Sequence, residues 1–595
     1  MLWHISWFLS ASTLVIAAIL AWICSKKKRA KVKPFYVLLA GVFLSSVFMI
    51  YPIYRDAFNG DLAAAFKSLI ISAHHTIQFF TADSDYSLVS DNIAQLPYWL
   101  KEAYALLGTV LIILAPLLTF GFVLSFIKGV AAQLQYMFHA PADTFVFSEI
   151  NQNTVSLAES IEKDNPKAIL VFAKAPGEEG QIEEGLVNRV NWLQAICYKQ
   201  DISRIRLKRN GAGKKTCFFV LSNDESRSIS EALRLIPKYK DRKNTTIYLF
   251  SSSQESELML TNLDKGELIV RRVNPLTSFV NHILYTQGDL LFTSAIDSNE
   301  NDKEISALIL GVGQLGTEML KALTWYCQMD NYRFRLNGFD IDESCKDRLA
   351  AQCPELISEK YNGVFVKGEA FYQIDIHTCD VNTGSFREKI RQIGNISYAF
   401  VSLGNDSLNV AAAVNLRIWF EQMHIHPVIM AVVSDSEKCA ALAGAKDKNG
   451  TPYDIHFIGD AKTIYSADVI LHVALEEEAL ELHKRYNEGN PYGFYEYEYN
   501  YKSSMASVIH FDARRKRNIP GADKSDAELS KIERETIETL EHRRWNAYMR
   551  SEGFVYSKSK DKSSRNDLGK MHNNLIEYGE LSEEDKRKDS LVGAK

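Results

Sequence analysis

A glycine-rich turn contains the residues of this chain whose types and spacing best fit a chemical task. Three glycines, spaced Gly-x-Gly-x-x-Gly, follow the apolar run 306–310 and open a helical pattern. In such a unit the first glycine permits a tight turn, the second lets a pyrophosphate approach the backbone, and the third allows close packing of helix and strand. Asp340 ends the next predicted strand, where a carboxylate can accept hydrogen bonds from ribose hydroxyls. The predicted contacts are Gly311, Gly313, Gln314, Leu315, Gly316 and Asp340.

The order of strand, turn, helix and acid predicts a site for NAD or another adenine nucleotide as the cofactor. The alternative is a Rossmann fold that keeps its glycines for packing and binds nothing.

Other reactive residues form neither a catalytic nor a metal-binding pattern in the sequence. The eight cysteines are scattered without a Cys-x-x-Cys pair, and His424 and His426 precede an apolar strand as a loop pair. No Ser-His-Asp or Tyr-x-x-x-Lys set lies beside the glycine turn. We therefore predict no metal, no catalytic residue and no enzymatic activity. A membrane-tethered NAD-dependent enzyme is kept as an alternative, because folding can bring distant residues together.

Three uncharged apolar runs have the length of membrane-spanning helices, at 5–24, 35–54 and 103–127. They define a predicted transmembrane domain, 1–139, in contact with membrane lipid. A basic cluster at 26–33 follows the first run, so the positive-inside rule places the N-terminus outside and the later domains in the cytoplasm. The net charge of −5 and the isoelectric point near 6.3 provide no basic field for nucleic acid.

The outward segment between the second and third runs contains a predicted amphipathic helix at 61–80. Its apolar positions recur with helical spacing, and its polar residues lie on other faces. Two interpretations stay open: a pore helix between two spans, or an interfacial helix lying on the membrane. If ions pass, rings of Asp83 or Asp85 would have to select them. Three spans cannot enclose a pore, so conduction requires a homo-oligomer.

From about residue 140, β-rich runs alternate with helical patterns in two copies, which is typical of α/β units with a parallel sheet. In the second copy, 303–475, a strand ends in Gly404, Asn405 and Asp406 before the next helix. This run resembles the cytoplasmic domain that regulates potassium conductance (RCK or TrkA-N type), found in Trk-type uptake systems and in calcium-gated potassium channels. The resemblance implies a Rossmann nucleotide domain to which these three residues contribute.

The first copy, 140–291, has the same order of elements without the glycines. The run 143–151 replaces the glycine-rich turn, and Asn223-Asp224 fall where Asn405-Asp406 do in the second copy. We interpret the first copy as a tandem partner with a degraded nucleotide site. Two such units per chain are similar to the gating rings of tandem-domain channels, where four chains supply eight units. That analogy favours a tetramer.

The segment 476–524 is predicted to be a linker or docking segment, because a charged run and a tyrosine-rich run follow the last α/β pattern. Its basic run 514–517 is interpreted either as phosphate-facing or as a solvated face. Ser525 and Glu528 have the spacing of a capping box and predict a long helix from there to about residue 551.

The C-terminal region, 525–595, contains a second candidate site. It contains the run Glu541-His542-Arg-Arg-Trp545, then Gly553-Phe554-Val-Tyr556, and later His572. This string resembles the ryanodine receptor (RyR) repeat domain, which also occurs in bacterial proteins behind nucleotide-binding domains. The resemblance implies a small, mainly helical domain that senses a nucleotide-like ligand. Phe554 and Asn573 depart from it, since tryptophan and proline are usual there. The candidate ligand residues are Glu541, His542, Trp545 and His572.

Together these features predict an α-helical membrane bundle of three spans, two Rossmann-like α/β units and a small, mainly α-helical RyR-type domain. The predicted function is an oligomeric, ligand-gated ion channel of the bacterial inner membrane, controlled by a small nucleotide. A nucleotide-sensing signalling or defence effector without conduction is a further alternative.

Overall fold

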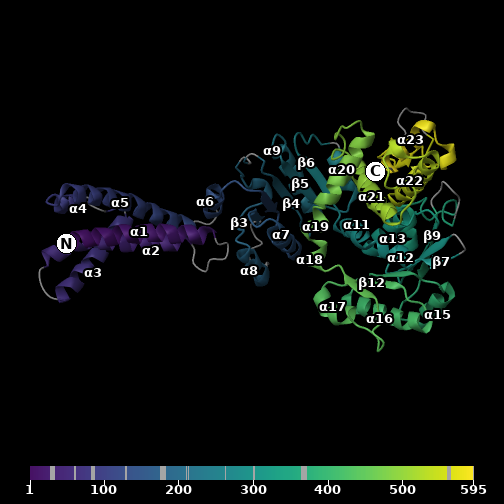
Figure 1. The fold of residues 1–595 in the computed structure, drawn as a ribbon, viewed down its shortest axis with the longest axis horizontal. Coiled ribbons are helices and arrows are strands. Elements are labelled where there is room, and N and C mark those ends of the chain that lie inside the picture. Colours follow the sequence, from purple (N-terminus) through teal and green to yellow (C-terminus); the bar gives the residue numbers. More distant parts are fainter. Residues whose placement is uncertain are drawn as a thin grey trace. The chain divides into compact units, whose positions relative to one another are not determined.

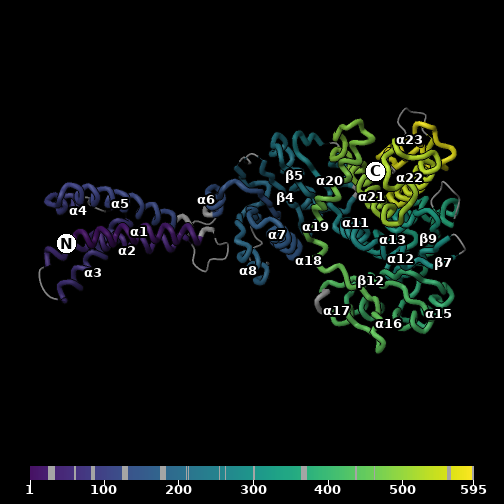
Figure 2. Tube along the Cα trace, in the orientation of Figure 1, coloured from purple at the N-terminus to yellow at the C-terminus, as the bar shows by residue number. Residues whose placement is uncertain are grey.

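The computed structural model divides the chain into two compact units (Figures 1 and 2). The first consists of Met1–Ala140, Asn188–Asp201 and Ile205–Lys208, and the second of Pro141–Val187, Ile202–Arg204 and Arg209–Lys595. The residues that the structure describes are 1–26, 34–58, 62–81, 83, 87–126, 130–174, 183–208, 211, 213–261, 263–298, 302–363, 371–558 and 565–593. Most of the basic cluster after the first apolar run, together with Asp85, therefore lies outside the described residues.

The N-terminal bundle is entirely helical, as its apolar composition predicts. Its helices are α1 (Leu2–Lys26), α2 (Pro34–Ala57), α3 (Leu62–Thr81), α4 (Ser87–Ile93), α5 (Tyr98–Phe126) and α6 (Val130–Phe138). Three of them are long and apolar enough to cross a membrane, at Leu2–Cys24, Pro34–Ala57 and Tyr98–Phe122. The three predicted candidate spans are thus confirmed as helices of spanning length.

Small residues bring α1 and α2 close together. A Cβ atom at Gly41 would overlap the Cβ of Ala17, so only glycine fits at that crossing. Nearby, the hydroxyls of Ser10 and Ser45 lie 2.8 Å apart in a fully buried contact, and each also donates to the other's main-chain carbonyl. These polar groups are satisfied inside the bundle, which a membrane environment requires.

Helix α3 has its polar side inward. Ser68, Ser72 and Thr76 are fully buried, and each hydroxyl donates to the carbonyl four residues earlier. The apolar side chains of Leu62, Phe66, Leu69, Ile70 and Ile77 are exposed. This arrangement is the reverse of a water-soluble amphipathic helix. The apolar periodicity predicted from the sequence is real, but it points away from the protein.

The first α/β unit contains a six-stranded sheet in the order β3-β2-β1-β4-β5-β6. Its strands are β1 (Thr144–Phe147), β2 (Ile169–Ala173), β3 (Ile196–Tyr198), β4 (Thr216–Val220), β5 (Thr245–Phe250) and β6 (Ile269–Val273). The helices between them are α7 (Gln152–Asp164), α8 (Glu184–Trp192), η1 (Ile202–Arg204), α9 (Glu225–Tyr239) and α10 (Gln254–Thr261). The recorded strand pairs around β1, β4 and β5 are parallel.

The second α/β unit repeats this order as β10-β9-β8-β11-β12-β13, with β7 added antiparallel to β8. Its strands are β7 (Ile296–Asp297), β8 (Lys303–Leu310), β9 (Tyr332–Asp340), β10 (Tyr372–Thr378), β11 (Tyr398–Val401), β12 (Val428–Val432) and β13 (Ile455–Ile458). Helices α11 (Pro275–Gln287) and α12 (Asp289–Thr293) precede this sheet. The others are α13 (Gln314–Tyr326), α14 (Cys345–Gln352), α15 (Gly384–Ile393), α16 (Asp406–Gln422), α17 (Ser436–Ala443), α18 (Ala461–Ile464) and α19 (Ala467–Ile470).

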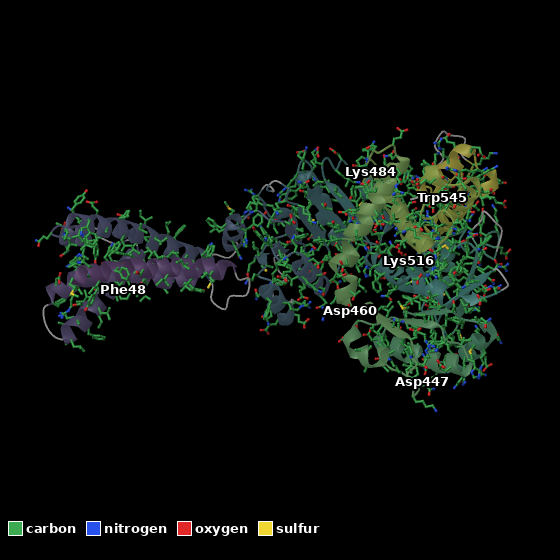
Figure 3. The ribbon with its side chains drawn as sticks, viewed as in Figure 1. Phe48, Asp447, Asp460, Lys484, Lys516 and Trp545 are labelled. Carbon is green, nitrogen blue, oxygen red and sulfur yellow. The ribbon has the colours of Figure 1, made fainter. Side chains whose placement is uncertain are left out.

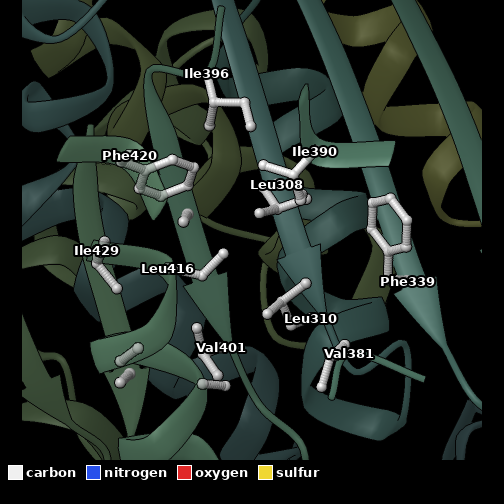
Figure 4. Close-up of a cluster of buried hydrophobic side chains, with 14 of the residues drawn as sticks. Leu308, Leu310, Phe339, Val381, Ile390, Ile396, Val401, Leu416, Phe420 and Ile429 are labelled. Atoms are coloured by element: carbon white, nitrogen blue, oxygen red, sulfur yellow. The ribbon is translucent and has the colours of Figure 1, made fainter. Parts of the chain in front are cut away.

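Both sheets thus have the strand order of a doubly wound, Rossmann-like fold, in which the chain changes direction between the first and fourth strands. In the second α/β unit, a buried core holds α15 and α16 against the sheet. Leu308, Phe339, Ile390 and Leu416 belong to this cluster and are completely buried (Figure 4). The core fixes the carboxyl ends of β8 and β11 side by side, which is where such folds bind ligands.

The C-terminal part contains α20 (Val473–Tyr486), α21 (Glu498–Lys516), η2 (Asp526–Glu528), α22 (Lys531–Ser551), β14 (Val555–Tyr556), β15 (Arg565–Asn566), β16 (Met571–His572), η3 (Tyr578–Glu580) and α23 (Glu583–Gly593). The segment 476–524, predicted as a linker or docking segment, is docked on the first α/β unit and is not a free linker. Its helices pack into the second compact unit, where Glu476 pairs with Arg271 and Glu498 with Arg272 at 2.6 Å. All four side chains are largely buried, so this segment is structural.

The helix predicted from Ser525 begins later. The capping box of Ser525 and Glu528 forms, but it opens only the short 3-10 helix η2. A second box, of Ser530 and Glu533, starts α22, which ends at Ser551 as predicted. The sequence thus contains two capping boxes five residues apart, and the second one, at Ser530, begins the long helix.

Candidate functional site

A cavity of about 620 Å³ lies at the carboxyl ends of the strands of the second sheet; we call it the turn cavity. Residues that follow each of the strands β8, β9, β10, β11, β12 and β13 line it. The cavity therefore spans the point where the strand order reverses. Of the nine residues predicted for the nucleotide site, seven line this cavity, and Gly316 and Asn405 do not. The lining includes Gly311, Gly313, Gln314, Leu315, Asp340, Asp380, Asn382, Ser402, Gly404, Asp406, Asn409, Ser434 and Gly459.

Gly316 lies behind the cavity wall, against Gly311. A Cβ atom at Gly316 would overlap the Gly311 carbonyl oxygen, so this glycine permits the close packing of α13 on β8. Gly311 itself has φ +87°, and a Cβ there would overlap the carbonyl oxygen of Ser402. Both glycines are therefore required by the fold, whether or not a ligand binds.

Gly313 has a different environment. Apart from its two chain neighbours, no described residue has an atom within 4 Å of the position that its Cβ would take. It is the N-cap of α13 and supplies no side chain to the first turn of that helix. The positive end of the helix dipole and its main-chain N–H groups thus face open space in the turn cavity, which is the geometry that binds phosphate.

Asp340 is held at the end of β9 by two main-chain hydrogen bonds. Its Oδ2 accepts from the Val312 N–H at 2.7 Å and its Oδ1 from the Asp342 N–H at 2.9 Å. Each carboxylate oxygen can accept a second hydrogen bond, so the group keeps capacity for a hydroxyl donor. The hydrogen bond from Val312 also fixes the glycine turn relative to the Asp340 carboxylate.

The turn after β11 is built by polar side chains. Asn405 caps α16 by accepting from the N–H of Ser407 at 2.9 Å, which explains why it does not line the cavity. Asp406 accepts from the N–H of Ser434 at 2.9 Å, and Asn409 joins Leu403 to the end of β12. Asn405 is thus structural, Asn409 both holds the turn and lines the cavity, and Gly404 and Asp406 also line it.

Sequence reasoning missed Asp380, Asn382 and Ser434, which also line the turn cavity. Each follows the carboxyl end of a strand, β10 or β12. That position is the signal that could have identified them, because ligands of such sheets bind there.

In the first α/β unit the corresponding place is filled by the protein. Asn151 caps α7 with its side chain, and its amide group donates to Glu149 at 2.7 Å. The Glu149 carboxylate also accepts from the Asn223 N–H at 3.3 Å. A side chain and a negative charge thus lie where the second unit has Gly313. This supports the interpretation that the first unit has lost its nucleotide site.

The predicted correspondence between the two units must be shifted by one residue. Asp224 is the N-cap of α9 as Asn405 is of α16, so Asn223 does not correspond to Asn405. Glu225 then corresponds to Asp406, and it accepts from the N–H groups of Ser252 and Ser253 as Asp406 does from Ser434. The two units are aligned correctly by their helix N-caps, Asp224 and Asn405. The dipeptide Asn-Asp that both units contain predicted the wrong alignment.

A third place of interest is a cavity of about 310 Å³ in the C-terminal part; we call it the module cavity. All four residues predicted for the RyR-type site line it. Trp545 on α22 (Figure 3) is half-buried, and its indole N–H donates to the Tyr499 hydroxyl at 3.1 Å. Its ring meets that of His572 edge to face at 4.8 Å and stacks near His542 at 5.8 Å.

The histidines of the module cavity are fixed by the protein. The two nitrogens of His542 lie 2.8 Å from the Ile576 carbonyl and 3.2 Å from the Asp589 carboxylate. His572 accepts from the Asn574 N–H at 3.1 Å, and burial, with the nearby Arg565 charge, lowers its pKa to about 4. His572 is therefore a neutral ring at physiological pH.

Glu541 and the basic run belong to the interior. Glu541 is 1% exposed and pairs with Arg544 at 2.8 Å and with Arg514 at 3.3 Å. Arg515 and Lys516 pair with Asp512 on their own helix. The run 514–517 is thus not a phosphate-facing set. The basic side chains that line the module cavity are Arg544, Arg565 and Lys588.

Neither a scan against protein-family models nor a search of curated proteins finds a match for this chain. Among the described residues, no group of three or more His, Cys, Asp or Glu side chains could hold a metal ion. The fold class is that of two Rossmann-like units joined to apolar helices, and the functional argument rests on the cavities themselves.

Proposed function

We propose that this protein is an oligomeric ion channel of a bacterial inner membrane and that its Rossmann-like part senses an adenine nucleotide. The observation that carries the proposal is the uncapped N-terminus of α13, which opens at Gly313 into the turn cavity. Helix ends of this kind bind pyrophosphate, and an acid at the end of the second strand binds ribose. NAD and other adenine nucleotides are the ligand class that fits both groups.

The channel part of the proposal is supported by three apolar helices on the same chain. Three spans cannot surround a pore, so conduction needs several copies, and the resemblance to RCK gating rings favours four. Through the positive-inside rule, the basic cluster after the first span supports an N-terminus outside and a nucleotide site in the cytoplasm. The module cavity is assigned to a nucleotide-like ligand through the resemblance to RyR repeat domains.

The energy that gating demands is modest in an oligomer. A shift from 1:99 to 99:1 between closed and open states needs about 5.5 kcal/mol of differential binding. Divided over four chains, this is about 1.4 kcal/mol each, or a tenfold preference of each site for the open state. A single well-formed nucleotide site per chain can supply that difference.

The test is ion flux from liposomes that contain the purified full chain, with ATP or NAD added on the cytoplasmic side. We expect nucleotide-dependent flux in the native protein and none with Gly313→Asp, because the new carboxylate repels the pyrophosphate. The matched control is Gly185→Asp, at an exposed glycine in the first turn of α8. It adds the same charge away from the cavities and should conduct normally.

Absence of flux with either nucleotide, or flux that Gly313→Asp leaves unchanged, would contradict the proposal. Nucleotide turnover without flux would favour the tethered enzyme instead. Binding without flux or turnover would favour a signalling effector.

A further inference from the structure

Helix α6 exposes large apolar side chains at one end of the N-terminal bundle. It begins at Val130, shortly after α5 ends at Phe126. In Figure 1 it lies at the end of the bundle where α1 also ends, away from the N-terminus. Met137 and Phe138, in its last turn, are 58% and 85% exposed. Two apolar side chains are thus uncovered where a spanning helix would leave the hydrocarbon core and meet the lipid headgroups.

The chain returns to α6 after the first two strands of the first sheet. Two later segments belong to the same compact unit as the bundle; we call Asn188–Asp201 and Ile205–Lys208 the return segments. Gln133 on α6 donates to the Arg206 carbonyl at 3.2 Å. The Lys208 ammonium donates to the main-chain carbonyl of His139, directly after α6. These contacts hold the return segments beside α6.

The return segments carry an excess of positive charge. They contain one acid, Asp201, and four basic residues, which are Arg189, Lys199, Arg206 and Lys208. The sequence run 188–215, which includes both segments, has eight basic residues and one acidic residue in a chain of net charge −5. Arg206 is exposed and forms no ion pair with a described residue. Its guanidinium group is therefore available to an anion from outside the chain.

An exposed tryptophan lies in the same segments. Trp192 ends α8 and is 68% exposed. Tryptophan is enriched at membrane–water interfaces, where its ring lies at the level of the headgroups. Basic side chains together with exposed aromatic and apolar ones are typical of a surface that rests on an anionic bilayer. We call Met137, Phe138, Trp192, Lys199 and Arg206 the headgroup surface.

We propose that the headgroup surface binds anionic phospholipid in the leaflet where α1 and α5 end. Lys199 and Arg206 contact the lipid phosphates, and the apolar side chains of α6 enter the headgroup region. Lipid is the partner because α6 continues a helix of spanning length, so lipid lies within its reach, and because the charges are complementary. The proposal rests on the three helices crossing a membrane and does not depend on nucleotide gating.

The experiment is photo-cross-linking of the full chain in liposomes. The probe is phosphatidylglycerol with a photoreactive group at the top of an acyl chain, and mass spectrometry locates the adducts. We expect adducts in 188–208 as well as in the bundle, whose adducts serve as the internal reference. A phosphatidylcholine probe of the same design should label the bundle equally and 188–208 at least fivefold less.

The double variant Lys199→Gln, Arg206→Gln should lower the yield of phosphatidylglycerol adducts in 188–208 at least fivefold, relative to the bundle. Each basic side chain near an anionic membrane surface strengthens binding by about fivefold, so the loss of two exceeds this threshold. The matched control is Lys446→Gln, Lys448→Gln, which removes two charges from an exposed loop of the second α/β unit. It should label as the native protein does.

The proposal is overturned if the anionic probe labels only the bundle, if the two probes label 188–208 equally, or if the double variant labels as the native protein does. Melting in detergent checks that the double variant is folded. If it is destabilised, Arg206→Gln alone decides, with an expected loss of at least twofold.

The outcome is separate from that of the proposed function. Charge-dependent labelling of 188–208 without nucleotide-dependent flux would leave the headgroup surface standing while the channel function fails. Nucleotide-dependent flux without such labelling would overturn the headgroup surface alone.

Discussion

Gly313 and Gly316 lie three positions apart in one turn but have opposite surroundings. The first faces open space, and the second lies against the Gly311 carbonyl oxygen. Gly313 also has extended backbone angles, φ −74° and ψ −160°, that other residues can adopt. One glycine is therefore available to a ligand, and the other is required by packing.

The same substitution should separate these two roles. We expect Gly316→Ala to lower the free energy of unfolding by about 1–3 kcal/mol, as overpacked sites do. Gly313→Ala should change stability by less than about 0.5 kcal/mol, as surface substitutions do, and should weaken ADP binding. Thermal unfolding and calorimetry of both variants check this. Equal stability of the two variants would contradict the assigned packing role.

His572 makes the stability of the C-terminal part depend on pH. Its pKa is about 4 in the folded chain, against an ordinary value near 6.5, because burial disfavours the charged ring. Between these values the unfolded chain binds the proton and the folded chain does not. The free energy of unfolding should therefore fall as the pH drops from about 6.5 to about 4, by up to roughly 3 kcal/mol for this group.

Replacement tests that dependence. In His572→Asn the amide oxygen can still accept from the Asn574 N–H, but nothing titrates, so the loss of stability in this pH range should be smaller. Tryptophan fluorescence during unfolding at pH 4.5 and 7 measures it. His424→Asn, on an exposed turn with φ +57° that asparagine tolerates, is the control. An unchanged pH dependence in His572→Asn would show that the buried ring does not control it.

At the scale of elements, α3 gives the N-terminal bundle an exposed, mainly apolar surface. Its buried hydroxyls face the bundle, whereas Leu62, Phe66, Leu69, Ile70 and Ile77 are exposed, together with Lys67 and His74. A helix that lies on the membrane surface should expose its polar face to water. In α3 the hydroxyl face is covered by protein and the exposed face is mainly apolar, so we expect that exposed face to contact lipid or another copy of the chain.

A cysteine at Ile70 should therefore react with a lipid-soluble maleimide in membranes, and a cysteine at Ser72 should not. The exposed fractions are 54% for Ile70 and 0% for Ser72. Mass spectrometry of labelled membranes measures the difference. The native protein, labelled in parallel, gives the background from its own cysteines. Stronger labelling at position 72 than at position 70 would mean that α3 is turned the other way.

The elements differ in how far the sequence predicts them, and the reason is the range of the interactions. The three apolar runs and the glycine turn are local patterns, and they predicted α1, α2, α5 and α13 correctly. Helix α21 could not be placed from its sequence, because its ion pairs join residues more than two hundred positions apart, such as Arg272 and Glu498. The sequence predicted the part of the turn cavity formed by the glycine turn. Asp380 and Ser434 reach the cavity only because the strands before them lie beside β9 and β11 in the sheet, which the sequence does not show.

At the scale of the whole molecule, the orientation across the membrane is the central prediction. The basic cluster at 26–33 should keep the first loop inside, so that Asp83 is outside. An impermeant thiol reagent should label Asp83→Cys in intact cells. Lys446→Cys, exposed on the second α/β unit, should be labelled only after lysis, and the native protein gives the background from its own cysteines. The reverse pattern would place the Rossmann-like units outside the cell.

The ion pairs of Arg271 and Arg272 also have a consequence for synthesis. Their partners Glu476 and Glu498 are made 205 and 226 residues later. At roughly 5–20 residues per second, the ribosome needs on the order of 10–40 s to reach them. During that time the buried guanidinium groups of Arg271 and Arg272, on the edge strand β6, lack these carboxylates. A message that stops before residue 476 would leave both cations without these two partners, so truncated copies should be less stable and should be removed by chaperones and proteases.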